Sequence, residues 1–535
     1  MRELHDFILV GSGPSGSMAA QTLVENGADV LMLDGGFFSD KSYSLIPEKS
    51  FEDIRQHEEE QYRYLLGDSF EGLPLGELGT GAQLTPSRQF ITERTDELLP
   101  LHSETFSPMQ SLARGGLGSG WGAGCCVFSA DELRLAGMDP TSMHEAYNTI
   151  ASRIGISGER DDSSNYTIAA LDNILPPQNI DNNAQMLLSE YGRKKAKLNA
   201  LGFHLGKPGL ALLTEKMGNR HETKYHNMDF YSDKRKSVWR PWMTIDELSG
   251  ADNFSYRGGS LVLRFSEAGK QVEVTYLDLE SNSIKKVRCR KLILACGALN
   301  TARVVLASYN DRSTSLPLLC NPYYYVVCLQ AGLMGKISRA ERTSLAQLSI
   351  FYDPDGGNRD VSMASVYSYS SMMMFRLLNR LPVNMRDGRK LLQFIMPGML
   401  IAGIHHPDMP SVDKFVKLGL KSQNGREVLK TTFRLSHSES CKVRQRNKLF
   451  RKALRMLGCL PVKTVHPGFG SSIHYAGTLP YSVNAADYSL HPSGRLHQTT
   501  AVYVADSSGF TFLPAKGITL SIMANAHLVA QNAID

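Results

Sequence analysis

The sequence predicts an α/β protein, α+β overall, in which a largely parallel sheet is assembled from distant parts of the chain. Its first segment is a short apolar strand, a glycine-rich turn and a helix, and its last segment is a strand followed by a helix. Between residues 315 and 435, strand-like segments alternate with turns rich in Asp, Gly, Pro and Asn, which is typical of an antiparallel sheet. We therefore expect a discontinuous first domain and an inserted second domain.

The composition is that of an ordinary globular protein. Of its 535 residues, 42% are apolar and 21% are charged, so the chain is not mostly disordered, collagenous or coiled coil. The net charge of +5 is small for this length and gives no electrostatic footprint for nucleic acid. None of the eight cysteines forms a Cys-x-x-Cys pair, and we expect free thiols in a reducing compartment.

No segment predicts a secretory signal or a transmembrane helix. Polar and acidic residues precede the first apolar run, Phe7–Val10, which does not resemble a signal peptide. The longest apolar segment, Phe394–Ile404, is interrupted by Pro397 and Gly398 and is too short to cross a bilayer. We therefore expect a cytoplasmic protein.

One region leaves a peripheral membrane contact open. Seven of the 21 methionines lie between residues 363 and 399, and flexible thioethers suit an adaptable apolar surface such as a substrate lid or a membrane-facing lip. A Met-rich core and a solvated basic face are the simpler interpretation. The basic residues beside these methionines are Arg376, Arg380, Arg386, Arg389 and Lys390.

The N-terminal segment has a β-α-β pattern. Asp6–Val10 is a nearly continuous apolar run, as expected for a parallel strand buried on both faces. The turn Gly11-Ser-Gly13-Pro-Ser-Gly16 follows, and Ser17–Asn26 has a helical pattern. Asp29–Leu33 is the second expected strand, and Asp34 lies at its end.

This pattern predicts a dinucleotide-binding site. Gly11 permits a tight turn, Gly13 lets backbone N–H groups approach a pyrophosphate, and Gly16 permits close packing of the helix on the strand. The start of the helix supplies the positive end of its dipole. Asp34 would accept hydrogen bonds from ribose hydroxyls and disfavours a 2′-phosphate, so the motif favours FAD or NAD over NADP without separating the two.

Two later segments favour a flavin. Leu292–Arg303 is an apolar strand, a turn of small residues and a helix, and Ala501–Asp506 is a strand that ends in an acid before the last helix. Flavoproteins that build one Rossmann domain from distant segments use such a terminal strand. It brings a backbone amide and an Asp to the ribityl and pyrophosphate region.

With these segments in place, the sequence resembles the glucose–methanol–choline (GMC) oxidoreductase family. The resemblance rests on the N-terminal glycine motif, the glycine cluster Gly115–Gly124, Leu292–Arg303 and the C-terminal block. In that block, His474-Tyr-Ala-Gly-Thr478 is similar to the family's His-x-x-Gly-Thr motif. Val502–Ser507 and Thr519–Ala524 are similar to its terminal strand and to the start of its final helix.

The resemblance implies an FAD enzyme that oxidises the CH–OH group of a sugar, polyol, cyclitol or sterol-like alcohol to a carbonyl. Hydride would pass to flavin N5, and His474 would take the hydroxyl proton as the catalytic base, a role that suits a neutral imidazole. The electron acceptor would be O₂ or an unidentified partner. The residues implied in FAD binding are Gly11, Gly13, Ser15, Gly16, Asp34, Gly116, Ser119, Gly120, Trp121, Gly122, Ala295, Gly297, Asp506 and Thr519.

One position departs from the family pattern at the expected catalytic site. The family usually has an Asn or His as the second group for the substrate oxygen, and this sequence has Gly517 there. A shifted alignment offers Lys516 or Thr519 instead, and a partner from elsewhere, such as His466 or the His405-His406 pair, is an alternative. His474 acting alone is another. A redox-neutral or nicotinamide-dependent flavoenzyme, or a catalytically impaired FAD-binding protein, are the competing functions.

Two further features concern how a cofactor would be held. Gly120 stands where some relatives carry a histidine that attaches FAD covalently, so we expect non-covalent FAD. His405-His406-x-Asp408 could be read as a metal triad, but adjacent residues on a strand point to opposite faces. We therefore predict no metal site.

The expected domains follow from these segments. The FAD-binding domain would comprise residues 1–36, 110–130, 255–310 and 461–535. The substrate-binding domain would comprise residues 37–109, 131–254 and 311–460.

Overall fold

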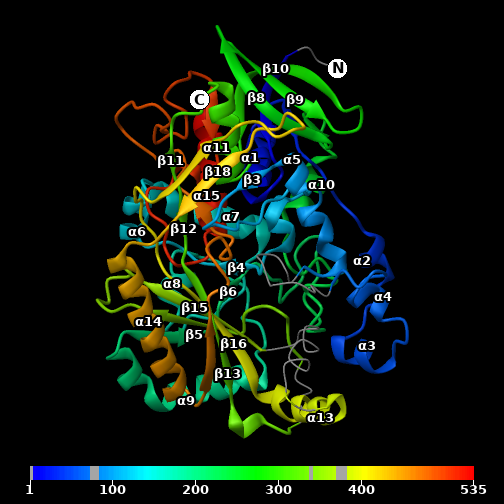
Figure 1. The fold of residues 1–535 in the computed structure, drawn as a ribbon, viewed down its shortest axis with the longest axis vertical. Coiled ribbons are helices and arrows are strands. Elements are labelled where there is room, and N and C mark those ends of the chain that lie inside the picture. The colour runs from blue at the N-terminus through cyan, green and yellow to red at the C-terminus, as the bar shows by residue number, and fades with distance from the viewer. Residues whose placement is uncertain (1–3, 73–83, 337–340, 369–381, 383, 535) are drawn as a thin grey trace.

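The computed structural model describes residues 4–72, 84–336, 341–368, 382 and 384–534. A mostly parallel sheet lies at one end, close to both chain termini, and an antiparallel sheet lies at the opposite end (Figure 1). Part of the Met-rich and basic region, including Met372–Met374, Arg376 and Arg380, falls outside the described residues.

The first sheet has seven strands and joins both ends of the chain. Its order is β7-β2-β1-β10-β9-β8, and β21 also pairs with β10. The first half of β10 pairs antiparallel with β9, and its second half runs parallel to β1 and β21. The predicted α/β fold, with its first domain built from distant segments, is confirmed. The strands are β1 (His5–Val10), β2 (Val30–Leu33), β7 (Phe254–Arg257), β8 (Ser260–Ala268), β9 (Gln271–Asp278), β10 (Ser283–Leu294) and β21 (Val502–Val504).

Helices from distant parts of the chain cover this sheet. The first and last helices, α1 (Pro14–Glu25) and α15 (Thr519–Ile534), pack side by side through small buried residues such as Ala19 and Ala530 (Figure 1). Two helices from the segment that the sequence assigned to the substrate domain also pack here, α7 (Pro140–Ile154) on α15 and α10 (Pro241–Leu248) on α1. Their apolar faces are buried against these helices, which sequence order alone does not reveal.

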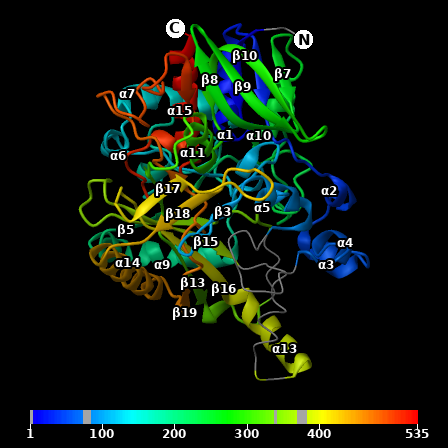
Figure 2. The same ribbon diagram turned by 45° about the horizontal axis from the view of Figure 1, so that its top comes forward.

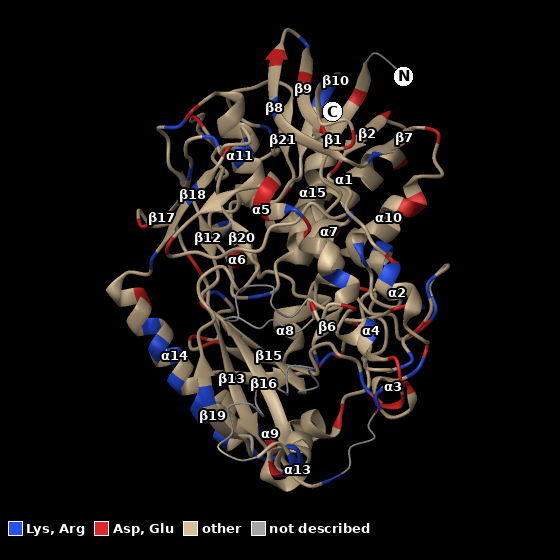
Figure 3. Ribbon diagram, turned by 45° about the vertical axis from the view of Figure 1, so that its right-hand side comes forward, with Lys and Arg blue, Asp and Glu red and all other residues tan. Residues whose placement is uncertain are grey.

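The second sheet has six antiparallel strands in the order β19-β13-β16-β15-β14-β5. Its strands are β5 (Phe203–Gly206), β13 (Tyr323–Leu329), β14 (Leu348–Tyr352), β15 (Ser362–Ser368), β16 (Met399–His405) and β19 (Leu460–Val465). Alternate residues such as Val326 and Leu400 pack under α9 (Asn182–Asn199) and α14 (His437–Met456). The intervening side chains face the opposite way, toward the first domain. The outer side of α14 carries exposed Lys and Arg residues (Figure 3).

Three segments of this region differ from the sequence-based expectation. β19 pairs with β13, so the expected FAD-binding segment 461–535 begins inside the second sheet. The strand expected over Phe394–Ile404 begins only at Met399, because α13 (Met385–Ile395), which Asn384 caps, and a 3₁₀ turn at Pro397 occupy the preceding residues. The strands near 414 and 430 form a separate sheet, β11-β17-β18-β3.

The remaining elements are short. Figure 2 shows α13 at the far end of the second domain and α2 to α4 at one side. None of the helices in the described part of the chain combines the length and hydropathy needed to cross a membrane. The remaining helices are α2 (Lys41–Leu45), α3 (Phe51–His57), α4 (Tyr62–Leu65), α5 (Thr95–Leu98), α6 (Ala130–Leu135), α8 (Ser164–Thr167) and α11 (Ala298–Ser308). The remaining strands are β3 (Leu101–His102), β4 (Gly124–Cys125), β6 (Gly209–Leu210), β11 (Leu316–Pro317), β12 (Leu319–Cys320), β17 (Lys414–Leu418), β18 (Leu429–Phe433) and β20 (Tyr475–Ala476).

Candidate active site

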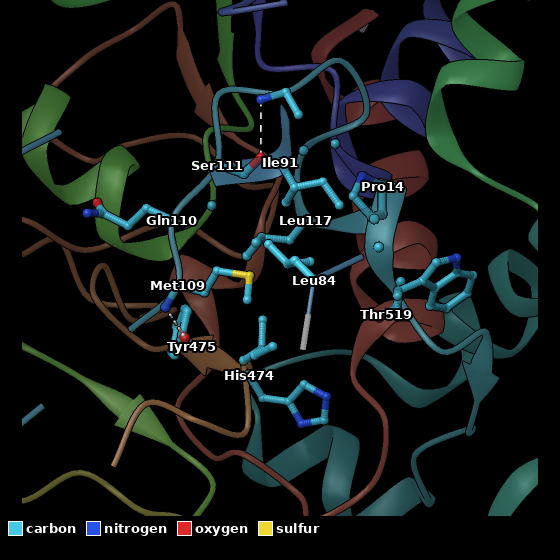
Figure 4. Close-up of a pocket in the computed structure, with 18 of the residues that line it drawn as sticks. Pro14, Leu84, Ile91, Met109, Gln110, Ser111, Leu117, His474, Tyr475 and Thr519 are labelled. Atoms are coloured by element: carbon cyan, nitrogen blue, oxygen red, sulfur yellow. Dashed lines mark hydrogen bonds between the residues drawn. The ribbon is translucent and has the colours of Figure 1, made fainter. Parts of the chain in front are cut away.

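A cavity of about 960 Å³ lies between the two domains, which is at the upper end of the usual range for small-molecule sites. The first domain contributes the turn before α1, the glycine cluster and the starts of α11 and α15. The second domain contributes one face of β13, β15, β16 and β19. Figure 4 shows Pro14 of the turn and the ring of His474 in this cavity, with apolar side chains such as Leu84 and Met109 between them.

The turn before α1 leaves a cradle at the wall of the cavity. Gly11 has a φ of +97°, and a Cβ there would lie 2.6 Å from the carbonyl oxygen of Ala295. A Cβ on Gly13 would meet nothing within 4 Å, and α1 starts at Gly13 without a side-chain cap or an acid in its first turn. Gly16 does not line the cavity, but its Cβ would lie 1.9 Å from the Gly11 carbonyl oxygen. Gly11 and Gly16 therefore permit close packing, whereas Gly13 leaves open space at the wall of the cavity.

Ser12, which the sequence analysis did not single out, connects three segments of this wall. Its hydroxyl donates to Asp34 Oδ2 at 2.6 Å and accepts from the backbone N–H of Gly115 at 2.8 Å. The Tyr256 hydroxyl donates to the same Asp34 oxygen at 2.8 Å. Burial raises the pKa of Asp34 by more than these hydrogen bonds lower it. Asp34 Oδ1 accepts from Ser12 N at 3.3 Å, and Asp34 lines the cavity.

Asp506 lines the cavity at the end of the terminal strand, where it also has a positioning role. Its Oδ2 accepts from Gly297 N at 2.9 Å and from Thr301 Oγ1 at 2.5 Å, which ties the start of α11 to β21. Its Oδ1 accepts from the backbone and hydroxyl of Ser508 at 2.9 and 2.5 Å. Burial raises the pKa of Asp506.

The glycine cluster passes close to the N-terminal turn. A Cβ on Gly116 would lie 3.3 Å from Gly13 Cα, and one on Gly118 would lie 2.8 Å from Pro14 Cγ. Ser119 does not line the cavity, because its hydroxyl turns inward and donates to the Arg114 carbonyl oxygen at 2.7 Å. The expected cofactor-binding residues that line the cavity are Gly11, Gly13, Ser15, Asp34, Gly116, Gly120, Trp121, Gly122, Ala295, Gly297, Asp506 and Thr519.

Strand register places His474 opposite Asn321. β12 and β20 pair antiparallel, with Leu319 opposite Ala476 and Cys320 opposite Tyr475. The residue after β12 therefore faces the residue before β20, and His474 Nδ1 lies 3.0 Å from Asn321 Oδ1. No sequence pattern pointed to Asn321, because its partner lies 153 residues away.

The contacts of Asn321 determine the tautomer of His474. The Asn321 amide nitrogen donates to the carbonyl oxygens of His406 at 2.8 Å and Pro514 at 3.0 Å. Carbonyls only accept, so Oδ1 must face His474 and accept from its Nδ1–H. Nε2 then carries a lone pair, and no hydrogen-bond partner for it occurs among the described residues. Burial lowers the pKa of His474 to about 4, so the ring is neutral near pH 7.

A second imidazole lies beside the first. The His405 and His474 rings have centroids 5.2 Å apart and planes 22° apart, and both line the cavity. His406 points to the opposite face, where Ser362 and Asn447 hold its two ring nitrogens at 3.0 Å each. The prediction that His405 and His406 face opposite ways is confirmed. His466 stacks on Tyr324 instead and does not line the cavity.

The residues near the expected second catalytic position have other roles. Gly517 does not line the cavity, and a Cβ there would lie 3.1 Å from the Gly124 carbonyl oxygen. Lys516 is fully buried, and its ammonium donates to Glu132 and Asn358 at 2.7 Å each. Lys516 is therefore a structural cation, not a group in the cavity. Thr519 lines the cavity as the first residue of α15.

The second domain supplies a wall that the sequence analysis did not identify. Its side chains lie at alternate positions of the strands, as the two-residue repeat of a strand requires. The sequence showed this two-residue repeat, but it did not show which face of the sheet would meet the first domain. The wall residues include Tyr323, Tyr325, Tyr367, Met399, Ile401, His405 and Val465.

Comparisons with known proteins agree with this architecture. No family model matches the chain. The chain is 23% identical to paromamine 6′-oxidase of Streptomyces fradiae over 544 residues, covering 97% of this chain and 90% of the relative. This similarity supports the resemblance of the chain to the GMC oxidoreductases. The structure of pyridoxine 4-oxidase from Mesorbium loti has the same fold, with a TM-score of 0.57, 13% identity and coverage of 98% of both chains.

The residues around the cavity fit FAD, which GMC oxidoreductases generally use. The uncapped start of α1 offers N–H groups to a pyrophosphate, and Gly13 leaves the space that a phosphate needs. Asp34 lines the cavity with a carboxylate, the acceptor that a ribose hydroxyl needs. Gly120 provides no side chain for a covalent bond to the cofactor.

Proposed function

We propose that this protein is a GMC-type oxidoreductase that binds FAD non-covalently and oxidises the CH–OH group of a small alcohol to a carbonyl, with His474 as the base. The observation that carries the proposal is the neutral His474, whose Nδ1–H is bound by Asn321 Oδ1 at 3.0 Å while its ring lines the cavity. An imidazole with one nitrogen held as a donor presents the other as an acceptor.

The first domain binds and orients the cofactor in this proposal. Gly11, Gly13 and the start of α1 hold the pyrophosphate, and Asp34 holds the adenosine ribose. Bound FAD supplies a two-electron acceptor for a hydride. The apolar side chains between the turn and His474, including Leu84, Ile91 and Met109, exclude water from the reacting centre.

His474 moves the proton. Its Nε2 lone pair accepts the proton of the substrate hydroxyl as the carbon–hydrogen bond breaks, so the oxygen becomes a carbonyl oxygen without a free alkoxide. Asn321 keeps the ring in the required tautomer throughout. The low pKa of His474 makes the ring a weak base, so the proton returns readily to solvent after the reaction.

The relatives support the substrate class. Their names describe oxidases of paromamine and of pyridoxine, and we propose a sugar, polyol, cyclitol or sterol-like alcohol for this enzyme. O₂ as the electron acceptor is favoured by the same names. No described feature favours a redox-neutral or nicotinamide-dependent reaction.

Anaerobic reduction of the holoenzyme tests the proposal. Bleaching of the oxidised flavin band by at least one alcohol among paromamine, pyridoxine, myo-inositol, benzyl alcohol and cholesterol is the expected result. Bleaching only by NAD(P)H would replace the proposal with a nicotinamide-dependent enzyme, and no bleaching would indicate an FAD-binding protein. Admitting air afterwards separates an oxidase from a dehydrogenase, because only an oxidase is rapidly reoxidised by O₂.

The His474→Ala variant tests the base. We expect it to retain FAD and to slow flavin reduction by about 10²-fold or more, the scale of general base catalysis. His466→Ala is the control, because His466 is an exposed histidine just before the same loop that does not line the cavity. Equal reduction rates in the two variants would remove His474 from this role.

A further inference from the structure

His405 is held at the end of the cavity by aromatic contacts on both sides. Its ring centroid lies 4.6 Å from that of Tyr323 and 5.2 Å from that of His474. Gly403 makes room for this arrangement, because a Cβ there would lie 2.6 Å from the Tyr323 hydroxyl. The imidazole therefore has one packed position beside His474.

A single short segment sets the positions of both histidines. Asn321, just after β12, binds His474, and two residues later Tyr323 stands directly opposite His405 in the pairing of β13 with β16. The two imidazoles come from different parts of the chain, yet residues 319–323 position both of them. Such support keeps a pair of functional groups in fixed relative positions.

The ring nitrogens of His405 have no hydrogen-bond partner among the described residues, in contrast to the two bonded nitrogens of His406. The His405 nitrogens are not among the fully buried polar atoms that lack a partner, and an unbonded nitrogen at a cavity wall is open to water or a ligand. His405 lines the cavity, so a molecule in the cavity can supply the missing contact. Burial and the neighbouring His474 keep the pKa of His405 well below its usual value, so the ring is neutral and has one N–H to donate.

We propose that His405 donates a hydrogen bond to the reacting oxygen of the substrate and replaces the second catalytic group that Gly517 lacks. This inference rests on the proposed function. The O–H proton of the substrate moves to Nε2 of His474, the C–H hydrogen leaves carbon as a hydride for the cofactor, and the C=O bond forms. His405 keeps its proton and stabilises the negative charge that develops on oxygen.

A neutral donor suits this position. A charged imidazolium beside His474 would oppose its protonation, whereas a neutral His405 stabilises the oxygen and leaves His474 free to accept the proton. Two of the alternative groups are occupied or remote. Lys516 is bound to Glu132, and His466 stacks on Tyr324 away from the cavity.

Three variants of the FAD-loaded enzyme test the inference, with the alcohol that reduces the wild type fastest. His405→Phe keeps the aromatic packing and removes the N–H, and we expect kcat for flavin reduction to fall by about 10²-fold with KM nearly unchanged. His405→Gln restores an N–H donor, and we expect at least a ten-fold recovery over the Phe variant. His466→Phe makes the same change outside the cavity and should react like the wild type. FAD content and thermal unfolding midpoint are measured for all three.

The outcomes separate this inference from the proposed function. A wild-type rate in His405→Phe overturns the inference alone, as do equal losses in the Phe and Gln variants, which would assign His405 a packing role. A wild type that no alcohol reduces overturns the proposed function, and with it the substrate oxygen on which the inference rests.

Discussion

The turn before α1 and the histidine pair lie on the same cavity, but different kinds of contact build them. The turn is made by consecutive residues: Gly11 has a positive φ, and Gly16 is constrained by the backbone carbonyl of Gly11. The pair is made by His405 and His474, which are 69 positions apart in sequence and meet only through strands β12, β13, β16 and β20.

This difference separates two kinds of functional information. In the turn, a residue type is required by backbone geometry, so a spacing of glycines is enough to predict both fold and ligand. In the pair, the two imidazoles come together only through the register of the paired strands. Asn321 and Tyr323 give His474 and His405 their positions, and neither has a distinctive spacing from its partner.

The sharpest way to break this comparison is a pair of glycine substitutions in the turn. Gly16→Ala places a Cβ 1.9 Å from a backbone oxygen, and we expect unfolding to become easier by more than about 3 kcal/mol, at the top of the range for overpacking. Gly13→Ala places a Cβ in open space, so it should fold normally and lose FAD affinity. Chemical unfolding and flavin retention after gel filtration measure the two effects. A stable Gly16→Ala protein would contradict the packing role.

A tautomer test sharpens the other half of the comparison. Asn321→Leu has nearly the same shape but cannot accept from His474 Nδ1, and we expect flavin reduction to slow by about 10- to 100-fold, the usual effect of removing an orienting partner. ¹⁵N NMR of the histidine side chains gives an independent readout, because Nδ1–H should dominate for His474 in the wild type and not in the variant. An unchanged tautomer with an unchanged rate would show that Asn321 does not orient the base.

The smallest expected effect concerns pH and the buried histidines. Burial lowers the pKa of His406 to about 4, whereas an unfolded histidine titrates near 6.5. The stability that comes from the neutral ring is present above pH 6.5 and is lost as the pH falls toward 4. We expect a loss of roughly 1–2 kcal/mol from this group between pH 7 and 5. Urea unfolding of wild type and His406→Gln should show a shallower pH dependence in the variant, and equal slopes would refute the assignment.

Much of the first domain could be predicted from the sequence, and less of the second. The glycine turn, the strand ending at Asp34 and the final helix are specified locally, and the structure contains each of them. The sequence did not reveal that β19 lies in the second sheet, because its pairing with β13 joins strands more than 130 positions apart. Phe394–Ile404 was read as one strand because an apolar run does not distinguish a helix end from a strand.

The candidate site shows the same division. The sequence alone predicted a dinucleotide-binding turn and singled out His474, because backbone sterics and a short local motif carry those predictions. Only the tertiary structure decided that Gly517 stands outside the cavity, that Lys516 is bound to Glu132, and that His405 lies beside His474. The physical reason is that a side chain's chemistry depends on its neighbours, and in a folded chain the neighbours are chosen by strand register and domain packing.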